Sequence, residues 1–316
     1  MARYILTRLI RSLITLMVIV TIVFCLLRLM PVEGYFNNFA KMSQTQIDVG
    51  LQQMGLKDPL PVQLVHFYEN VLKGDLGTSN KFRRNVAITS IVAQKAPLSI
   101  KMGLLAMSLA LVLGLPLGII MSRSSRTRLK IGDRLGTVFV VLVQAIPSAV
   151  YYLFIQVYGT DLFGLPMRFS QSDFRTWVLP ITSLALGNIA YYAMWLRRYM
   201  VDESNRDYVK LARAKGLTNS QISVRHIFRN AFVPLIQYLP SSLLFTLMGS
   251  LYVESLYSIP GMGGLLVDVI KIQDNTMVQA LVLIYAGISI LGLLLGDLLM
   301  AAVDPRISFS KKEGAR

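Results

Sequence analysis

Six long apolar runs alternate with polar connections along the chain, and each is long enough, with its flanking residues, to cross about 30 Å of hydrocarbon as a helix. The runs cover residues 12–27, 102–122, 135–160, 176–196, 230–253 and 275–296. None of them contains Asp, Glu, Lys or Arg, and a centred Lys or Arg would cost about 2.5–3.5 kcal/mol on insertion. Five prolines interrupt these runs, namely Pro116, Pro147, Pro180, Pro234 and Pro240, but neighbouring helices in a membrane bundle can satisfy the carbonyls that are freed. The pattern predicts an all-α polytopic membrane protein with six transmembrane helices.

The connection between the fourth and fifth runs has a helical pattern of its own. Before Gly216, an apolar face and a basic face alternate at helical spacing. The apolar face holds Tyr208, Leu211 and Ala212, and the basic face holds Arg206, Lys210 and Arg213. Gly216 provides the left-handed residue that commonly ends a helix, and Thr218 with Gln221 forms a capping box that starts a second helix at once. The apolar stripe of this second helix holds Val224, Ile227, Phe228, Ala231 and Leu235.

A compact basic helix–glycine–helix suits docking onto a partner, but two other interpretations exist. Basic helical pairs also bind nucleic acid, although the flanking spans here would hold both ends at lipid headgroups, so we expect no nucleic-acid partner. A charged connection between spans can equally be an ordinary solvated loop. These residues alone do not decide between docking and a plain loop.

The connection from 31 to about 96 also carries helical signals. Ser43 with Gln46 is a capping box, Gly55 begins a break, and Pro61 suits the first turn of a new helix. Residues 86–96 are expected to form an amphipathic helix along the membrane surface. We therefore predict a small folded lobe, which either braces the bundle or receives a soluble partner.

Composition and charge agree with a membrane protein. Of the 316 residues, 54% are hydrophobic and only 16% charged, which is too apolar for a soluble protein. The net charge of +15 is concentrated in the amino end, the second and fourth connections and the tail, whereas the opposite short loops hold only Arg168, Arg175 and Lys271. The positive-inside rule therefore places both termini and the fourth connection in the cytoplasm and residues 31–96 outside.

Several functional classes find no support in the chain. The single Cys25 allows no disulfide within the chain, and His66 and His226 are too far apart in sequence to suggest a metal site. No Gly-x-x-x-x-Gly-Lys-Ser/Thr loop is present to hold ATP phosphates, so we expect no ATPase activity and no cofactor in this chain. Residues 28–31 offer no small-residue cleavage site, so we expect the first span to be retained rather than removed as a signal.

With Ala212 and Gly216 between spans four and five, the chain resembles the permease subunits of ATP-binding-cassette importers. Their cytoplasmic signature is Glu-Ala-Ala, three residues, Gly, nine residues and then Ile-x-Leu-Pro, of which only Ala212 and Gly216 match strictly. Where the chain departs from this signature, it resembles the oligopeptide/dipeptide branch of the family. Two patterns of that branch occur here in full, Tyr-Val-x-x-Ala-Arg-Ala-Lys-Gly at 208–216 and Arg-His-x-x-Arg-Asn-Ala at 225–231. Residues 56–60 and 74–79 resemble the outer loop of that branch's first, B-type, permease subunit. Residues 254–263 resemble the loop after span five, and 297–299 with 304–306 resemble the closing segment.

This resemblance implies a type I importer that moves peptides across the bacterial cell membrane by alternating access. The implied partners are a second permease, two ATPases that bind ATP and Mg²⁺, and an extracytoplasmic peptide-binding protein. The implied ATPase-coupling residues are Tyr208, Leu211, Ala212, Arg213, Ala214, Gly216, His226 and Arg229. A weaker assignment to the outer gate or binding-protein docking covers Asp58, Pro59, Asp75, Gly77, Glu254, Pro260 and Gly261. The implied division is 1–30 (first span), 31–96 (outer lobe), 97–303 (permease core, coupling loop 200–230) and 304–316 (tail).

Four polar residues within or beside the spans complete the predictions. We expect Asp297 to form a structural ion pair with Arg197 or Arg198, and Lys101 to reach the outer interface rather than bind substrate. Gln144 and Gln156 either line a polar path or pack structurally. An importer of nickel, opines or another small solute is an alternative of the same architecture. A secondary transporter, which would need ionisable residues deep in the spans, and a membrane-anchored interaction protein are alternatives from other classes.

Overall fold

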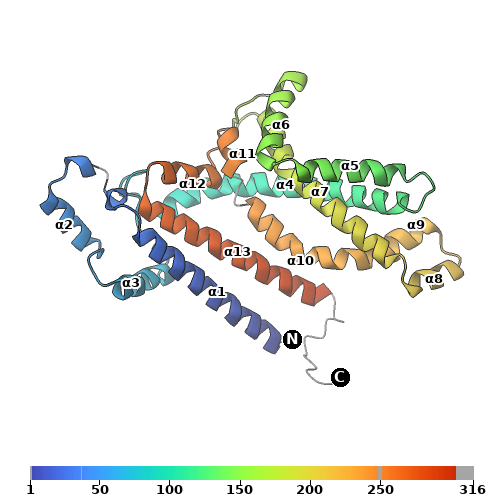
Figure 1. Ribbon diagram of the computed structural model, residues 1–316, viewed down its shortest axis with the longest axis horizontal. Helices are drawn as coiled ribbons and strands as arrows, with labels where there is room; N and C mark the ends of the chain where they lie inside the picture. Colours follow the sequence, from blue (N-terminus) through green and yellow to red (C-terminus); the bar gives the residue numbers. More distant parts are fainter. Residues whose placement is uncertain (1, 37, 248–250, 304–316) are drawn as a thin grey trace.

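The computed structural model describes residues 2–36, 38–247 and 251–303, and in these ranges the chain is helical with no β-strand (Figure 1). The five longest helices are α1 (Ala2–Arg28), α4 (Ile88–Ser124), α7 (Arg175–Glu203), α10 (Phe228–Leu247) and α13 (Asn275–Val303). The shorter ones are η1 (Val32–Tyr35), η2 (Phe39–Lys41), α2 (Gln44–Gln53), α3 (Leu60–Leu72), α5 (Ile131–Ala145), α6 (Ser148–Phe163), α8 (Asp207–Ala214), α9 (Asn219–Gln221), η3 (Ile222–Ile227), α11 (Leu251–Leu256) and α12 (Met262–Lys271).

Glycines allow the closest pair of long helices, α4 and α7, to pack backbone against backbone. A Cβ at Gly114 would lie 2.9 Å from the carbonyl oxygen of Ile189, and one at Gly118 would lie 2.8 Å from that of Ala193. Such four-residue spacing of small residues is typical of membrane helix interfaces. Helix α7, which leads into the connection around Gly216, is therefore packed closely against α4.

The predicted span over 135–160 is broken into two helices, as the proline in it suggests. The chain breaks at Ile146 and Pro147, and α5 and α6 meet at 107°. Ile146 has extended backbone angles because the following proline ring disfavours the helical conformation. Figure 1 shows α6 projecting from the side of the long helices.

The predicted total of six spans is not confirmed. By length and composition, the described residues contain four helices that could cross a membrane, in Leu6–Arg28, Ile88–Ser124, Asn219–Leu256 and Asn275–Met300. The count becomes five if the bent pair α5–α6 is one span. Although α7 packs within the bundle, it is not among these helices.

The separate surface helix predicted for 86–96 is also wrong, because these residues are the first turns of α4. Ile88 and Ile91 are fully buried against α12 and α13, and the helix continues through Pro97. The predicted boundary between 96 and 97 therefore falls inside one helix. The predicted tail, 304–316, lies outside the described residues.

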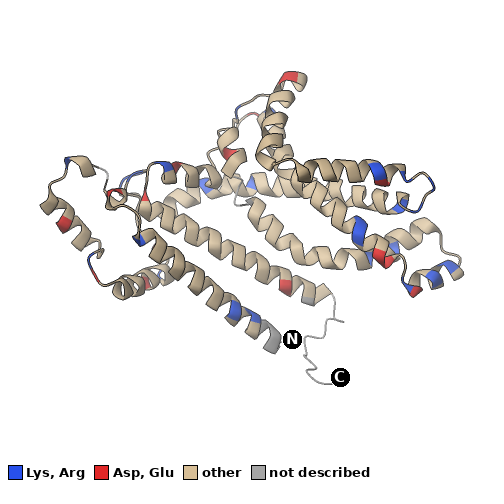
Figure 2. Cartoon of the chain, in the orientation of Figure 1, with Lys and Arg blue, Asp and Glu red and all other residues tan. Residues whose placement is uncertain are grey.

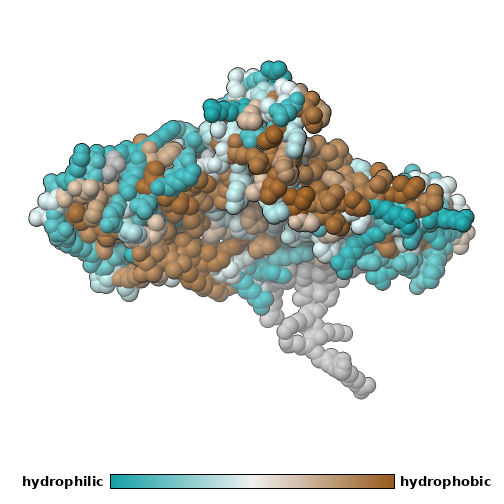
Figure 3. All heavy atoms as spheres, turned by 45° about the horizontal axis from the view of Figure 1, so that its top comes forward, coloured by the Kyte–Doolittle hydropathy of each residue, from teal (hydrophilic) through white to brown (hydrophobic). Residues whose placement is uncertain are grey.

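Charge and hydropathy divide the molecule along its length. Lys, Arg, Asp and Glu gather at the two ends, whereas the middle of the long helices carries almost none (Figure 2). A broad hydrophobic surface covers this middle region (Figure 3), and α1 alone exposes Leu9, Leu13, Met17, Val18 and Leu26 by about half of their surface. Exposed apolar side chains of this extent are expected where the surrounding solvent is lipid. We refer below to the α3 end (31–87 and 254–276) and the α8 end (123–133 and 203–227).

Candidate functional site

The connection around Gly216 forms the predicted helix–glycine–helix. Gly216 has a φ of +78°, and the amide of Leu217 donates to the carbonyl of Ala212 (3.3 Å), which closes the end of α8. The capping box is present, since the Thr218 hydroxyl accepts from the Gln221 amide while the Gln221 side chain accepts from the Thr218 amide (2.9 Å). These local predictions are confirmed.

The buried face of α8 differs from the predicted one. Val209 and Ala212 are buried at 1% and 5% exposure, whereas Leu211 is 57% exposed. Val209 and Ala212 lie three residues apart and so share a face, while Leu211 is rotated by about 200° from Val209. Tyr208 is half-buried, and its hydroxyl donates to Glu203 (2.8 Å). Burial raises the pKa of the Tyr208 phenol.

Ala212 therefore contacts its own chain, in a cluster with Leu196, Met200, Ile222 and Ile227, and does not share an exposed face with Ala214. The face of α8 that points away from the bundle carries Asp207, Lys210, Leu211 and Ala214, all of which are exposed. We call these four residues the outward face of α8.

The second helix becomes a π-helix, η3, directly after its first turn α9, which the sequence did not reveal. Ile222 and Ile227 are five residues apart and both buried, as suits the wider turn of η3. Val224, which the prediction placed in the buried stripe, is 48% exposed. His226 and Arg229 are exposed on the same segment.

The electrostatics of the α8 end are dominated by positive charge. Lys210 and Asp207 form an exposed ion pair (2.8 Å), and the hydrogen bond from Lys210 lowers the pKa of the Asp207 carboxyl. Arg126, in the loop between α4 and α5, lies near Arg213. Partial burial, and after it the charge of Arg213, lowers the pKa of the Arg126 guanidinium. Two connections distant in sequence thus meet to form one basic surface, which favours an acidic partner.

The seven residues assigned to the outer gate or to docking separate into two groups at the α3 end. Asp58, Pro59 and Asp75 are exposed on the lobe. The Asp75 carboxylate accepts from the Gly77 amide (2.8 Å), and Gly77 has a φ of +80°. These residues are placed where a soluble partner could reach them.

Glu254, Pro260 and Gly261 form the second group, in which Glu254 is only 3% exposed. Its carboxylate accepts from the Ser99 hydroxyl (2.7 Å) and the Gly264 amide (2.9 Å). A Cβ at Gly261 would overlap that carboxylate, so only glycine fits there. Pro260 is exposed beside it. Glu254 thus joins the 261–264 segment to α4 from a buried position.

Sequence reasoning missed a second buried carboxylate, Asp274. It is fully buried and accepts from the Ser79 hydroxyl (2.7 Å) and the amides of Asn80, Lys81 and Phe82 (3.1, 2.9 and 3.1 Å). It also caps α13 by accepting from the Met277 amide (3.2 Å). The only sequence signal was an Asp directly before a long apolar helix, which is typical of an N-cap.

The intramembrane acid Asp297 is paired, but not with the predicted partner. Arg8 of α1 lies 2.9 Å from one oxygen, and the Gln237 amide donates to the other at 3.0 Å. Arg197 instead pairs with Asp133 of α5 (2.8 Å). Asp297 therefore connects α1 to α10 and α13, because α13 packs between these two helices.

Of the remaining predicted polar residues, Gln156 and Lys101 make contacts within the bundle and Gln144 does not. Gln156 is buried and donates to the carbonyls of Met167 and Leu256 (3.2 and 3.0 Å), whereas Gln144 is exposed. The Lys101 ammonium lies 4.6 Å from the centre of the Trp177 ring, a cation–π contact.

A groove of about 400 Å³ between α6, α7 and α10 is lined by both polar and apolar side chains, none of them charged among the described residues. It is formed by Tyr152, Leu184, Gly187, Asn188, Tyr191, Tyr238, Ser242, Phe245 and Thr246. Tyr191 stacks on Tyr238 with 4.8 Å between ring centres, and the Asn188 amide approaches the Thr246 hydroxyl at 3.5 Å. We call this the tyrosine groove. No group of three or more His, Cys, Asp or Glu suited to a metal ion occurs in the part of the chain that the structure describes.

Two family models match the chain. Residues 114–309 match "Binding-protein-dependent transport system inner membrane component", and residues 1–102 match "Binding-prot-dependent transport system membrane comp, N-term". Together these matches cover both the α1–α3 region and the bundle that carries α8 and the tyrosine groove.

Proteins similar in sequence to this chain include permease proteins of peptide transport systems. The oligopeptide transport system permease protein AmiC of Streptococcus pneumoniae is 38% identical over 215 residues, covering 67% of this chain but only 42% of AmiC. The dipeptide transport system permease protein DppB of Lactococcus lactis is 32% identical over 310 residues, covering 97% of this chain and 99% of DppB.

A solved structure has the same fold over about two thirds of the chain. A chain of the inward-facing MetNI methionine ABC transporter matches with a TM-score of 0.54 and 16% sequence identity, over 68% of this chain and 97% of that chain. At this identity the match establishes the importer permease fold alone.

Proposed function

Because the chain belongs to the family of inner membrane components of binding-protein-dependent transport systems, we propose that it is a permease subunit of an ATP-driven importer of short peptides. It is a multi-pass membrane protein of a family whose members are transport components and not catalysts.

The tyrosine groove is the observation that supports a peptide substrate. Its hydroxyl and amide groups can hydrogen-bond a peptide backbone, which is the same in every peptide, and its aromatic faces accept varied side chains. No charged residue of the described ranges lines it, so neither an acidic nor a basic side chain would be held or excluded by charge. This chemistry suits a path that many peptide sequences must follow without binding tightly.

The open side of the groove is the proposed contact with a second permease subunit. Two such subunits facing one another would enclose a path between their grooves, and rocking of one bundle against the other would expose it to either side in turn. The extracytoplasmic peptide-binding protein would deliver substrate at the α3 end, where Asp58, Pro59 and Asp75 are exposed.

The outward face of α8 is the proposed contact with an ATPase subunit. Lys210, Leu211 and Ala214 project away from the bundle, while Val209 and Ala212 fix α8 to the chain's own core. A movement of the ATPase would thus pass through α8 and η3 into α10, and ATP and Mg²⁺ would be bound by that partner. The α8 end and both termini would then face the cytoplasm, in agreement with the excess of Lys and Arg there.

The alternatives have less support in the site. A nickel importer would be expected to offer imidazole or carboxylate ligands along its path, and the groove has neither. A secondary transporter would need an ionisable group free to couple, whereas Asp297 is bonded to Arg8 and Gln237.

The test is uptake of labelled peptides by the complete importer reconstituted in vesicles. Tyr191→Ala and Asn188→Ala should lower uptake of several unrelated peptides at least severalfold, while peptide-independent ATP hydrolysis persists. Tyr158→Ala, on the exposed side of α6, is the matched control and should transport normally. Undiminished uptake by both groove variants would exclude the groove as the path.

A further inference from the structure

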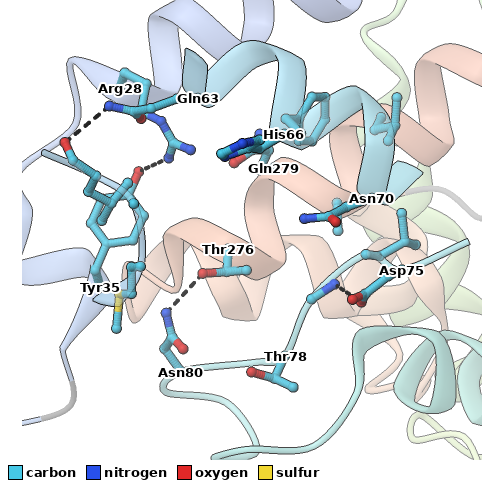
Figure 4. Close-up of a pocket in the computed structure, with 18 of the residues that line it drawn as sticks. Arg28, Tyr35, Gln63, His66, Asn70, Asp75, Thr78, Asn80, Thr276 and Gln279 are labelled. Carbon is cyan, nitrogen blue, oxygen red and sulfur yellow. Dashed lines mark hydrogen bonds between the residues drawn. The ribbon is translucent and has the colours of Figure 1, made fainter. Parts of the chain in front are cut away.

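A second cavity lies at the α3 end, apart from the tyrosine groove. It has a volume of about 410 Å³ and is enclosed by the end of α1, by α3, by the loop that follows α3 and by the first turns of α13. Figure 4 shows polar side chains directed into it from each of these elements. Its size is within the range of pockets that hold small organic ligands.

Three buried polar atoms of the cavity lining have no hydrogen-bond partner among the described residues. They are Nε of Arg28, Oε1 of Gln63 and Nε2 of Gln279. Gln279 is only 9% exposed. The orientation of the Gln63 amide is fixed, since its Nε2 donates to the carbonyls of Leu56 and Asp58 (3.1 and 2.8 Å). Buried polar groups are normally satisfied, so three orphans around one cavity indicate that something polar binds there.

Arg28 defines the charge of that ligand at one end of the cavity. Its guanidinium is held in place by a hydrogen bond from Nη1 to the Tyr35 hydroxyl (2.9 Å) and by the face of Phe24, 4.5 Å away. No carboxylate of the described residues lies within ion-pair distance of it. A permanently charged, partly buried group without a counter-ion is costly, and an anionic ligand group would relieve that cost.

The opposite side of the cavity carries negative charge. Figure 4 shows Asp75 and Asn70 across the cavity from Arg28. One oxygen of Asp75 accepts from the Gly77 amide (2.8 Å), which orients the carboxylate. A positive group on the ligand would be favoured here.

We propose that this cavity binds a zwitterion, with its anionic group on Arg28 and Gln279 and its ammonium group toward Asp75. Two sources share this chemistry, namely a free dipeptide and the headgroup of phosphatidylethanolamine. The site is distinct from the tyrosine groove and does not depend on the groove being the transport path.

The experiment measures binding to the full importer. Radiolabelled L-alanyl-L-alanine is tested by equilibrium dialysis on protein freed of phosphatidylethanolamine, and lipid retained from phosphatidylethanolamine vesicles is quantified separately. Arg28→Gln should lower the affinity for the zwitterion at least about tenfold, which corresponds to loss of one charge-assisted contact. Asp75→Asn, on an exposed residue that leaves folding intact, should weaken it severalfold, and N-acetylation of the dipeptide should remove that dependence on Asp75.

Two controls separate this site from the groove and from general surface charge. Tyr191→Ala should leave this binding unchanged, and Arg84→Gln, which removes an exposed arginine of the same lobe, should also have no effect. Dipeptide binding lost in Arg28→Gln supports the peptide source, and phosphatidylethanolamine retention lost in Arg28→Gln supports the lipid source. The proposal is overturned if neither the dipeptide nor the lipid binds to the natural chain. It is also overturned if each probe that binds does so as tightly to Arg28→Gln and Asp75→Asn as to the natural chain, in which case the cavity holds water.

Discussion

The two ends of the molecule hold their turns in different ways. At the α3 end, the buried carboxylate of Asp274 accepts from Ser79 and Asn80 in a loop distant in sequence. The buried carboxylate of Glu254 accepts from the Ser99 hydroxyl of α4 and from the Gly264 amide. At the α8 end, Asp207 is exposed and the buried Asp133 pairs with Arg197 of α7. The turn after α8 depends instead on Gly216, a threonine cap and the burial of Val209 and Ala212. The turns of the α3 end are therefore tied by charge-assisted bonds, whereas the turn after α8 is held by backbone geometry and apolar packing.

This difference suits two functions, a rigid support at the α3 end and a contact for a partner at the α8 end. A carboxylate buried among amide donors fixes one arrangement, because any movement leaves several groups unpaired at once. The charged side chains of α8 lie at the surface, so a force applied to this short helix can pass through the glycine turn without breaking a buried polar network. We therefore expect the α3 end to be a rigid support and the α8 end to be where partner forces enter.

The largest effect expected from this comparison is that of Asp274→Ala. Five donors lose their acceptor, and we expect the free energy of unfolding to fall by about 3–5 kcal/mol. Proteolysis within 79–85 should become faster, as seen by mass spectrometry of fragments. Asp268→Ala, an exposed acid on α12, is the control and should be resistant. If both variants resist protease alike, Asp274 does not fix this loop.

Ala212→Arg should have the next largest effect, because it places a long charged side chain inside the cluster that holds α8. Overpacking of this kind costs about 1–3 kcal/mol, measurable as a lower temperature of thermal unfolding. Ala214→Arg, two residues further on the outward face, should leave that temperature unchanged but weaken co-purification with the ATPase. The comparison fails if Ala214→Arg unfolds as early as Ala212→Arg.

Gly216→Val should act through the backbone alone. A β-branched residue at a φ of +78° costs about 1–2 kcal/mol, so the angle between α8 and η3 should change while the chain still inserts. The ratio of peptide transported to ATP hydrolysed should fall in vesicles. Gly216→Asn tolerates the left-handed conformation and should restore most of the ratio. Equal behaviour of the two variants would show that the turn does not depend on φ.

Sequence reasoning succeeded where a feature depends on neighbouring residues. The caps at Ser43 and Thr218 and the turn at Gly216 each involve atoms within about six residues, so their pattern is readable. It failed where partners are distant, as for Ser79 and Asp274, which are 195 residues apart. The pairing of Asp297 with Arg8 and not Arg197 has the same cause, since it depends on which helices pack together.

The rotation of a helix about its axis was the other limit. Leu211 looks as apolar as Val209, and only the contact of α8 with the bundle shows which is buried. The tyrosine groove needs three helices to be placed together, and Pro147 predicts a break without giving its angle of 107°. Composition and periodicity established the fold class, but which surfaces meet is decided by tertiary packing.

The smallest effect we predict is that of Arg213→Gln, and it tests whether charge or shape governs the α8 end. Arg213 flanks the buried face near Arg126, so its removal relieves like-charge repulsion and should not lower the unfolding temperature. It lies outside the outward face, so the ATPase should still co-purify and uptake should fall less than twofold. Leu211→Ala, which removes the apolar side chain of the outward face, should weaken ATPase association more than Arg213→Gln does. The reverse order would mean that the basic surface, and not the fit of α8, attracts the partner. The contrast between an α3 end held by charge-assisted bonds and an α8 turn held by packing would then no longer explain where the partner binds.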